Sequence, residues 1–177
     1  MAHRYGLGLA FLGLLFAACP ALRVNIPPKD PTPPSLSWSV YHHGTGQRNE
    51  HPGSPTLNAK QGDRYRILLI ATDPGGVKSI EINSDVGSGE VEWFCDDPAG
   101  GGFGDRKHSM LSPQTLTLTP AADGKVLSSA FVTYELDLTL ACNPGWTFTS
   151  GRAFLTGRAT NYHGGTTTEV LTFRISP

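Results

Sequence analysis

Residues 130–142 read AFVTYELDLTLAC and alternate apolar with polar side chains. Successive side chains of a β-strand point to opposite faces, so this pattern predicts a long strand with one face buried. The apolar face includes Tyr134, Leu138 and Cys142, and the opposite face includes Glu135. This stretch therefore predicts a β protein in which the Cys142 sulfur points into the core.

The same alternation recurs on both sides of this stretch. Runs rich in Gly, Pro, Asn and Asp separate the alternating segments and are typical of turns. No segment after Pro34 shows a sustained helical period. Short strands with such turns predict an all-β fold, an antiparallel β-sandwich of about eight strands. The further strands are predicted at residues 36–40, 65–71, 77–83, 90–95, 116–118, 152–161 and 166–175.

The composition limits the size and class of the protein. The chain has 177 residues with 21 Gly and 14 Pro, and only 16% of the residues are charged. This length suits one domain with appendages, and the Gly and Pro content disfavours a helical bundle. The 14 basic residues are balanced by 15 acidic ones. Because a nucleic-acid binder needs a clustered excess of Lys and Arg, we expect no nucleic-acid partner.

The chain begins with features of an export signal. Residues 6–18, GLGLAFLGLLFAA, form an uncharged apolar run that is shorter than the roughly 20 residues of a membrane-spanning helix. The run leads into FAAC at residues 16–19, which resembles the lipobox of bacterial lipoproteins. The resemblance implies removal of a signal peptide, residues 1–18, and acylation of Cys19. We therefore expect a lipid-anchored protein of the bacterial cell envelope, periplasmic or surface-facing; ordinary secretion is the alternative.

A proline-rich segment follows the cysteine. Residues 20–34, PALRVNIPPKDPTPP, contain six prolines. Proline fixes φ and lacks an N–H, so we expect this segment to stay outside helices and sheet interiors. As polyproline-like chain it would reach about 45 Å. This predicts a tether at residues 19–34, between the anchor and a β-sandwich domain at residues 35–177; a proline-rich recognition motif is the alternative.

The two remaining cysteines, Cys95 and Cys142, lie on apolar faces of predicted strands. With Cys19 removed from thiol chemistry they form an even pair, as expected of an exported protein. We therefore hypothesise a Cys95–Cys142 disulfide, worth about 4 kcal/mol in the chain-entropy model. Buried cysteines are usually inert, so we expect no catalytic role for either.

Two stretches resemble parts of bacterial immunoglobulin-like domains. ATDPGGVKSIEI at residues 71–82 is similar to their turn between the second and third strands, and AFLTGRATNYHGGT at residues 153–166 is similar to their last hairpin. The resemblance implies an immunoglobulin-like sandwich that serves as an adhesive, spacer or ligand-presenting module. The cysteines do not match the antibody-type positions, and the calcium motifs of cadherins are absent, so no calcium site is implied.

Residues 96–112, DDPAGGGFGDRKHSMLS, form the longest stretch without periodicity. Loops of this length are usually functional or disordered. We interpret this one as a mobile surface loop and, as the alternative, treat it as a candidate binding loop. Its acidic residues lack the spacing of a calcium loop, and we predict no metal site. The candidate binding residues are Asp96, Asp97, Phe103, Asp105 and Arg106.

Aromatic side chains in or beside turns are candidates for contacts with sugars. Trp146, Phe148 and Tyr162 occupy such positions, whereas Trp38 and Trp93 fall on core faces. The neighbouring His42 and His43 should face opposite ways, so we interpret the histidines as solvated.

The sequence contains no local signature of a catalytic site, such as Gly-x-Ser-x-Gly or His-Glu-x-x-His. We expect a non-catalytic envelope lipoprotein with no cofactor, whose domain docks to an envelope protein or a glycan. The alternatives are a carbohydrate-binding module that uses the turn aromatics and an exported metal-binding domain.

Overall fold

The computed structural model of the chain describes residues 22–27, 29–84, 89–99 and 104–177; the predicted signal peptide, Cys19 and Phe103 lie outside these ranges. All regular structure in the described part is β-strand, as predicted. No helix in these ranges is long and apolar enough to cross a membrane. The strands are β1 (Arg23–Val24), β2 (Ser35–His42), β3 (Arg48–Pro52), β4 (Thr56–Lys60), β5 (Arg64–Thr72), β6 (Val77–Ile82), β7 (Glu90–Asp96), β8 (Asp105–Met110), β9 (Gln114–Thr117), β10 (Val126–Leu127), β11 (Ser129–Asp137), β12 (Thr147–Asn161) and β13 (Thr166–Ser176).

The smaller of the two main sheets has four strands in the order β11-β5-β2-β3. All its pairings are antiparallel. β5 is an inner strand, and Ile67, Leu69 and Ala71 on its inward face are fully buried. The outward residues Leu68 and Ile70 are half-buried, which explains why this strand is apolar on both faces.

The larger sheet has seven strands built around β12, which spans 15 residues. One edge of β12 pairs with β13. The other edge pairs first with β7 and then with β6, so two consecutive strands share one long partner. β9 extends the sheet beyond β6, β8 extends it beyond β7, and β4 joins β13 in parallel.

The core lies between the inward faces of these two sheets. Trp38 from β2 and Phe173 from β13 are its largest fully buried side chains. Gly157 of β12 faces Trp38, and a Cβ atom at Gly157 would lie 2.7–2.8 Å from Leu69 and the indole ring. Glycine at this position therefore allows the two sheets to approach across the large indole.

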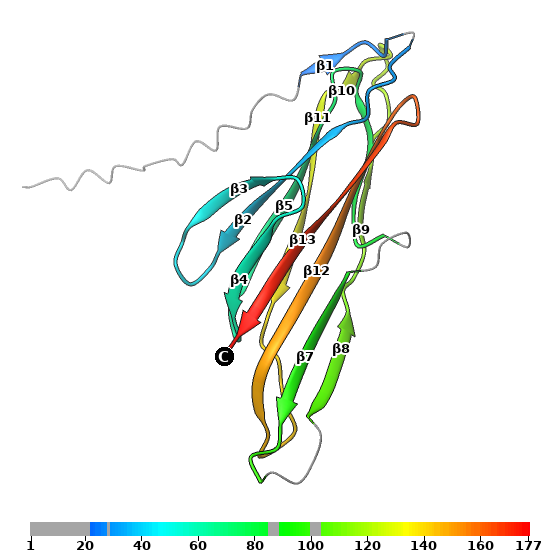
Figure 1. The fold of residues 1–177 in the computed structure, drawn as a ribbon. Coiled ribbons are helices and arrows are strands. Elements are labelled where there is room, and N and C mark those ends of the chain that lie inside the picture. Colours follow the sequence, from blue (N-terminus) through cyan, green and yellow to red (C-terminus); the bar gives the residue numbers. More distant parts are fainter. Residues whose placement is uncertain (1–21, 28, 85–88, 100–103) are drawn as a thin grey trace, which may run out of the picture.

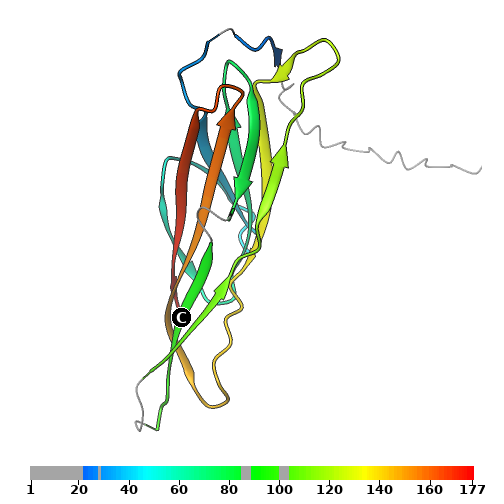
Figure 2. The same ribbon diagram turned by 90° about the vertical axis from the view of Figure 1, so that its right-hand side faces the viewer.

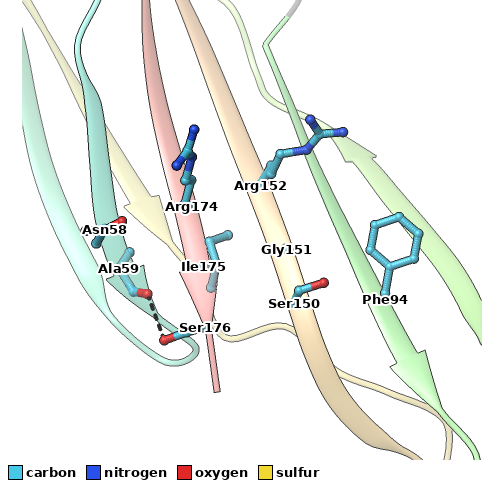
Figure 3. Close-up of a pocket in the computed structure, with 9 residues that line it drawn as sticks. All are labelled: Asn58, Ala59, Phe94, Ser150, Gly151, Arg152, Arg174, Ile175 and Ser176. Carbon is cyan, nitrogen blue, oxygen red and sulfur yellow. Dashed lines mark hydrogen bonds between the residues drawn. The ribbon is translucent and has the colours of Figure 1, made fainter.

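The molecule is elongated along its strands (Figures 1 and 2). We call one end the clamp end; it consists of the loops at residues 73–76, 121–125 and 161–165 together with residues 22–34. We call the opposite end the hairpin end; it consists of the β7–β8 hairpin and the segment at residues 138–146. An arginine-lined groove lies between the two ends, beside the C-terminal end of β13 and next to β12 and β7 (Figure 3).

The strand predicted at residues 130–142 is shorter than its alternation suggests, because β11 ends at Asp137. Asp137 pairs with Arg64, the first residue of β5, so no partner strand remains beyond this point. The Asp137 carboxylate also accepts a hydrogen bond from the Thr139 N–H, which bends the chain. Leu138 and Leu140 are nevertheless buried, so the pattern predicts burial better than strand length.

The described part contains thirteen strands rather than about eight. The additional strands β1, β3, β4, β8 and β10 are short, and sequences such as RNEHP in β3 lack a clear alternation. The stretch predicted as one long loop at residues 96–112 contains β8, which pairs with β7 over six positions. Cross-strand partners, rather than local propensity, create these short strands.

The described part of the proline-rich segment, residues 22–27 and 29–34, contacts the sandwich, whereas a free tether was expected from its prolines. β1 pairs antiparallel with β10, and backbone carbonyls of this segment accept hydrogen bonds from side chains of the sandwich. The prolines do stay outside the main sheets, as expected. Their carbonyl groups remain free to accept hydrogen bonds, because proline lacks only the donor.

Candidate functional site

The predicted disulfide joins Cys95 and Cys142, with 5.8 Å between their Cα atoms. Cys95 is fully buried on β7, and Cys142 lies in the segment that follows β11. The bond therefore attaches this segment to the inward face of the larger sheet. A disulfide of this kind is typical of proteins in an oxidising, exported compartment.

The described residues of the predicted binding loop, Asp96, Asp97, Asp105 and Arg106, do not converge on one site. The Asp97 carboxylate accepts the Ala99 N–H within its own turn. Asp105 pairs with Lys107 at 3.4 Å, and Arg106 binds Glu92 on the neighbouring strand. Asp96 is exposed at the end of β7. Among the described side chains, no group of three His, Cys, Asp or Glu residues is placed to hold a metal ion.

The predicted aromatic contacts also lie apart. Trp146 and Phe148 lie at the hairpin end, whereas Tyr162 follows the other end of β12. Phe148 is buried in the core, and the Tyr162 hydroxyl donates a hydrogen bond to the Leu118 carbonyl. These three rings cannot form one stacking surface for a sugar.

His42 and His43 make more hydrogen bonds and ion pairs than expected of solvated side chains. His42, the last residue of β2, and His43, which follows it, do point to opposite sides: His42 faces Asp63, whereas His43 Nε2 lies 3.1 Å from Glu135. His42 Nδ1 accepts the Thr45 N–H, so its Nε2 carries the proton and faces Asp63 at 3.2 Å. His42 lines a cleft of about 570 Å³ between β3 and β4, but both of its ring nitrogens are occupied.

A second hollow lies on the outward face of the larger sheet, where β13 ends and β12 continues beside β7 (Figure 3). It is a shallow groove of about 440 Å³. Its lining combines two arginines with a phenyl ring, a hydroxyl and an amide: Arg152, Arg174, Phe94, Ser150 and Asn58.

The strand register brings the two arginines together. Arg152 of β12 is the direct cross-strand partner of Arg174 of β13, and both side chains point outward. Asn58 of β4 is in register with Arg174 on its other side. Arg174 projects along its own strand, and Arg152 turns toward β7 (Figure 3). Directly opposed like charges are unfavourable in a sheet, so this pairing costs stability unless an anion compensates it.

One carboxylate compensates part of this charge. Glu92 of β7 is buried at 4% exposure, although it belongs to the outward face. Arg106 binds one of its oxygens, and an Arg152 guanidinium nitrogen lies 3.6 Å from the other. Among the described residues Arg174 has no ion pair. Two guanidinium groups, those of Arg106 and Arg152, therefore share the Glu92 carboxylate. Because Arg174 beside them adds a third positive charge, the groove carries excess positive charge beside Phe94.

These groups suit an anionic ligand with an apolar face. A guanidinium fork binds a carboxylate or phosphate through two parallel hydrogen bonds. The Ser150 hydroxyl and the Asn58 amide add polar groups for ligand hydroxyls. The Phe94 ring offers an apolar surface of the kind that packs against a sugar ring. Arg152 also lies over the Phe154 ring, at 5.6 Å from its centre, which restrains its position.

This groove was not predicted from the sequence, although one signal was present. Arg152 and Arg174 occupy polar positions of the two last predicted strands, and a tight hairpin turn at residues 162–165 would pair them. Asn58 and Phe94 carried no comparable signal, because their strands are placed by tertiary pairing. No protein-family model matches the chain, and no curated protein matches it either.

Proposed function

We propose that this protein is an exported, non-catalytic binding module that is anchored in the bacterial envelope through acylated Cys19 and binds a carboxylate-bearing glycan in the Arg152–Arg174 groove. One observation supports an anionic ligand: Arg152 and Arg174 are direct cross-strand partners. Arg152 is paired with Glu92, whereas Arg174 has no ion pair among the described residues. The lipobox-like FAAC sequence and the disulfide support export. The likeness to immunoglobulin-like domains supports a ligand-presenting role.

The groove is open and shallow, which suits a chain-like ligand that crosses several strands. Uronic acid residues carry a carboxylate on a ring with an apolar face, so they match both the guanidinium groups and Phe94. Because the charges are solvent-exposed, binding should weaken as salt concentration rises.

Calorimetric titration with polygalacturonate tests this proposal, with its methyl ester as the matched neutral probe. We expect binding to the acid form that is lost with the ester. Arg174→Gln should reduce affinity by about 10-fold or more, because a hydrogen bond to a charged group is worth about 1.5–3 kcal/mol.

Arg64→Gln serves as the matched control, since Arg64 is an exposed arginine on the other sheet, paired with Asp137 at 3.0 Å. It should leave polygalacturonate binding unchanged. Equal binding of the acid and the ester, or equal losses in the two arginine variants, would contradict a specific site in this groove.

A further inference from the structure

The N-terminal segment is attached to the clamp end from its first described residue. The Leu22 carbonyl accepts hydrogen bonds from the Ser128 N–H at 2.9 Å and from its hydroxyl at 2.8 Å. The next residues form β1, which pairs with β10. The chain is therefore held to the domain at Leu22, well before the first strand of the main sheets.

Further bonds hold the described part of the segment, whose course over the ends of the strands is visible in Figures 1 and 2. His163 Nε2 lies 2.8 Å from the Pro27 carbonyl, and the Asn161 amide donates to the Thr32 carbonyl at 2.8 Å. The Thr167 hydroxyl donates to the Pro34 carbonyl. The donors come from Asn161 at the end of β12, the turn that follows it and β13, so the segment crosses the clamp end and does not extend away from it.

The turn at residues 73–76 is shaped to receive this segment. The Asp30 carboxylate lies directly over Gly75, where a Cβ atom would overlap it. Pro27 also contacts this position, because its Cγ atom lies 3.1 Å from the point that such a Cβ atom would occupy. Asn161 binds both Thr32 and the buried Asp73, so one amide connects the segment to the turn.

The attachment limits how far an anchor at Cys19 lies from the domain. Leu22 is the third residue after Cys19. An extended chain covers at most about 3.6 Å per residue, so the span between their Cα atoms is at most about 11 Å. The free tether expected from the proline content would allow about 45 Å. The clamp end must therefore lie close to the surface in which the acyl group on Cys19 is inserted.

We infer that the domain stands on the bilayer surface by its clamp end, with the β7–β8 hairpin directed away from the membrane. This orientation rests on the anchoring at Cys19 in the proposed function. Arg152 lies nine residues along β12 from Asn161, so the groove is about 30 Å along the strand from the clamp end that faces the headgroups. The N-terminal segment thus acts as a clamp that sets the orientation of the domain and the distance of the binding groove from the bilayer surface.

Energy transfer to labelled headgroups in vesicles of neutral phospholipid tests this orientation with the full lipidated chain. A fluorescent amino acid is placed at position 123, in the exposed turn of the clamp end, or at position 98, in the exposed turn of the hairpin. We expect several-fold higher transfer from position 123 than from position 98. Insertion of about 12 Gly and Ser residues before Leu22 leaves the clamp intact but adds about 19 Å of reach, and should reduce this difference.

A second variant tests the clamp itself. His163→Leu combined with Thr167→Val removes two donors to the segment and should bring the two transfer values closer together, whereas Thr160→Val, on the outward face, should not. The chain without the insertion or substitutions should float with the vesicles in a density gradient. If it floats but energy transfer from positions 123 and 98 is equal, the orientation is wrong while the anchoring stands. Failure to float would overturn the anchoring and, with it, this orientation.

Discussion

The two ends of the sandwich are held together in different ways. At the clamp end, a proline-rich segment is bound by hydrogen bonds from side chains of the sandwich to its carbonyl groups. At the hairpin end, the four-stranded sheet has already ended, and the Cys95–Cys142 disulfide attaches residues 138–146 to the overhanging larger sheet. Where the second sheet is missing, a covalent bond replaces part of the packing that it would have supplied.

This difference has a physical basis in what each end can bury. At the clamp end the N-terminal segment lies across the ends of strands from both sheets and is held there by a few directional hydrogen bonds. At the hairpin end, Leu138 and Leu140 are buried although their own segment forms no strand. Such a segment loses more conformational entropy on folding for each contact that it makes. A disulfide reduces this entropy loss because it already restricts the unfolded chain.

The largest expected effect is at the hairpin end. Replacing both cysteines, Cys95→Ala with Cys142→Ala, should lower the free energy of unfolding by about 4 kcal/mol, because the bond closes a sequence separation of 47 residues. Urea denaturation measures the loss, and amide exchange should rise most in β7 and β8. Uniformly increased exchange at the clamp end would contradict the separate stabilisation of the two ends.

The next effect is at the clamp end. Asn161 is buried at 1% exposure and accepts hydrogen bonds from the N–H groups of His163 and Gly165. Asn161→Ala should cost about 2–3 kcal/mol, because these donors and the Asp73 carboxylate lose a buried partner. Urea denaturation again gives the magnitude. Thr160→Ala, one residue away on the outward face, is the control and should change stability by less than about 0.5 kcal/mol.

A smaller effect is expected between the two ends, where Gly157 of the larger sheet packs against Leu69 and Trp38 of the smaller one. The Cβ of Gly157→Ala would lie 2.7–2.8 Å from the fully buried Leu69 and Trp38, so we expect a loss of about 2 kcal/mol from overpacking. Gly157→Ala combined with Leu69→Ala should cost less than the sum of the two single changes, because the new methyl group fills part of the space that Leu69 leaves. If the losses in unfolding free energy of the two single variants, measured by thermal or urea unfolding, simply add in the double variant, the methyl group at position 157 does not clash with Leu69.

The smallest effects concern pH and the two aspartates that flank β5. Burial and the nearby Asp30 carboxylate raise the pKa of Asp73 above its ordinary value of 3.8, although hydrogen bonds from Gly75 and Asn161 oppose them. The folded state therefore binds a proton more readily than the unfolded chain, and this group's contribution to stability falls as pH rises above 3.8. Asp30→Asn should flatten that fall, as measured by urea denaturation across pH.

Asp63, at the other end of β5, behaves in the opposite way. Burial opposes its ionisation, but hydrogen bonds from the Lys60 N–H, the Tyr65 hydroxyl and His42 together lower its pKa below 3.8. Its contribution is therefore present above pH 3.8 and is lost as pH falls through the lowered pKa. Asp63→Asn should remove this acid-induced loss. The same pH response in the Asp30 and Asp63 variants would contradict the assignment of opposite shifts.

Much of the fold could be predicted because alternation along a strand reports burial directly. The strands near residues 36–40, 65–71 and 77–83 lie close to their predicted positions, and the disulfide pairing is confirmed. β3 and β4 could not be predicted, because edge strands are defined by the neighbours that pair with them. The predicted binding residues do not form one site for a related reason. The stretch predicted as a loop contains β8, which forms a hairpin with β7, and the charged side chains of this hairpin pair with one another.

The sequence by itself determined the all-β class, the inward face of each long strand and the pairing of two cysteines, because all three follow from side-chain direction along the chain. Only the tertiary structure decided where the polar groups meet. The register between β12 and β13 places Arg152 beside Arg174, and the fold of the clamp end turns a proline-rich segment into part of the domain. Both depend on contacts between residues far apart in the chain, whose partners no local pattern specifies.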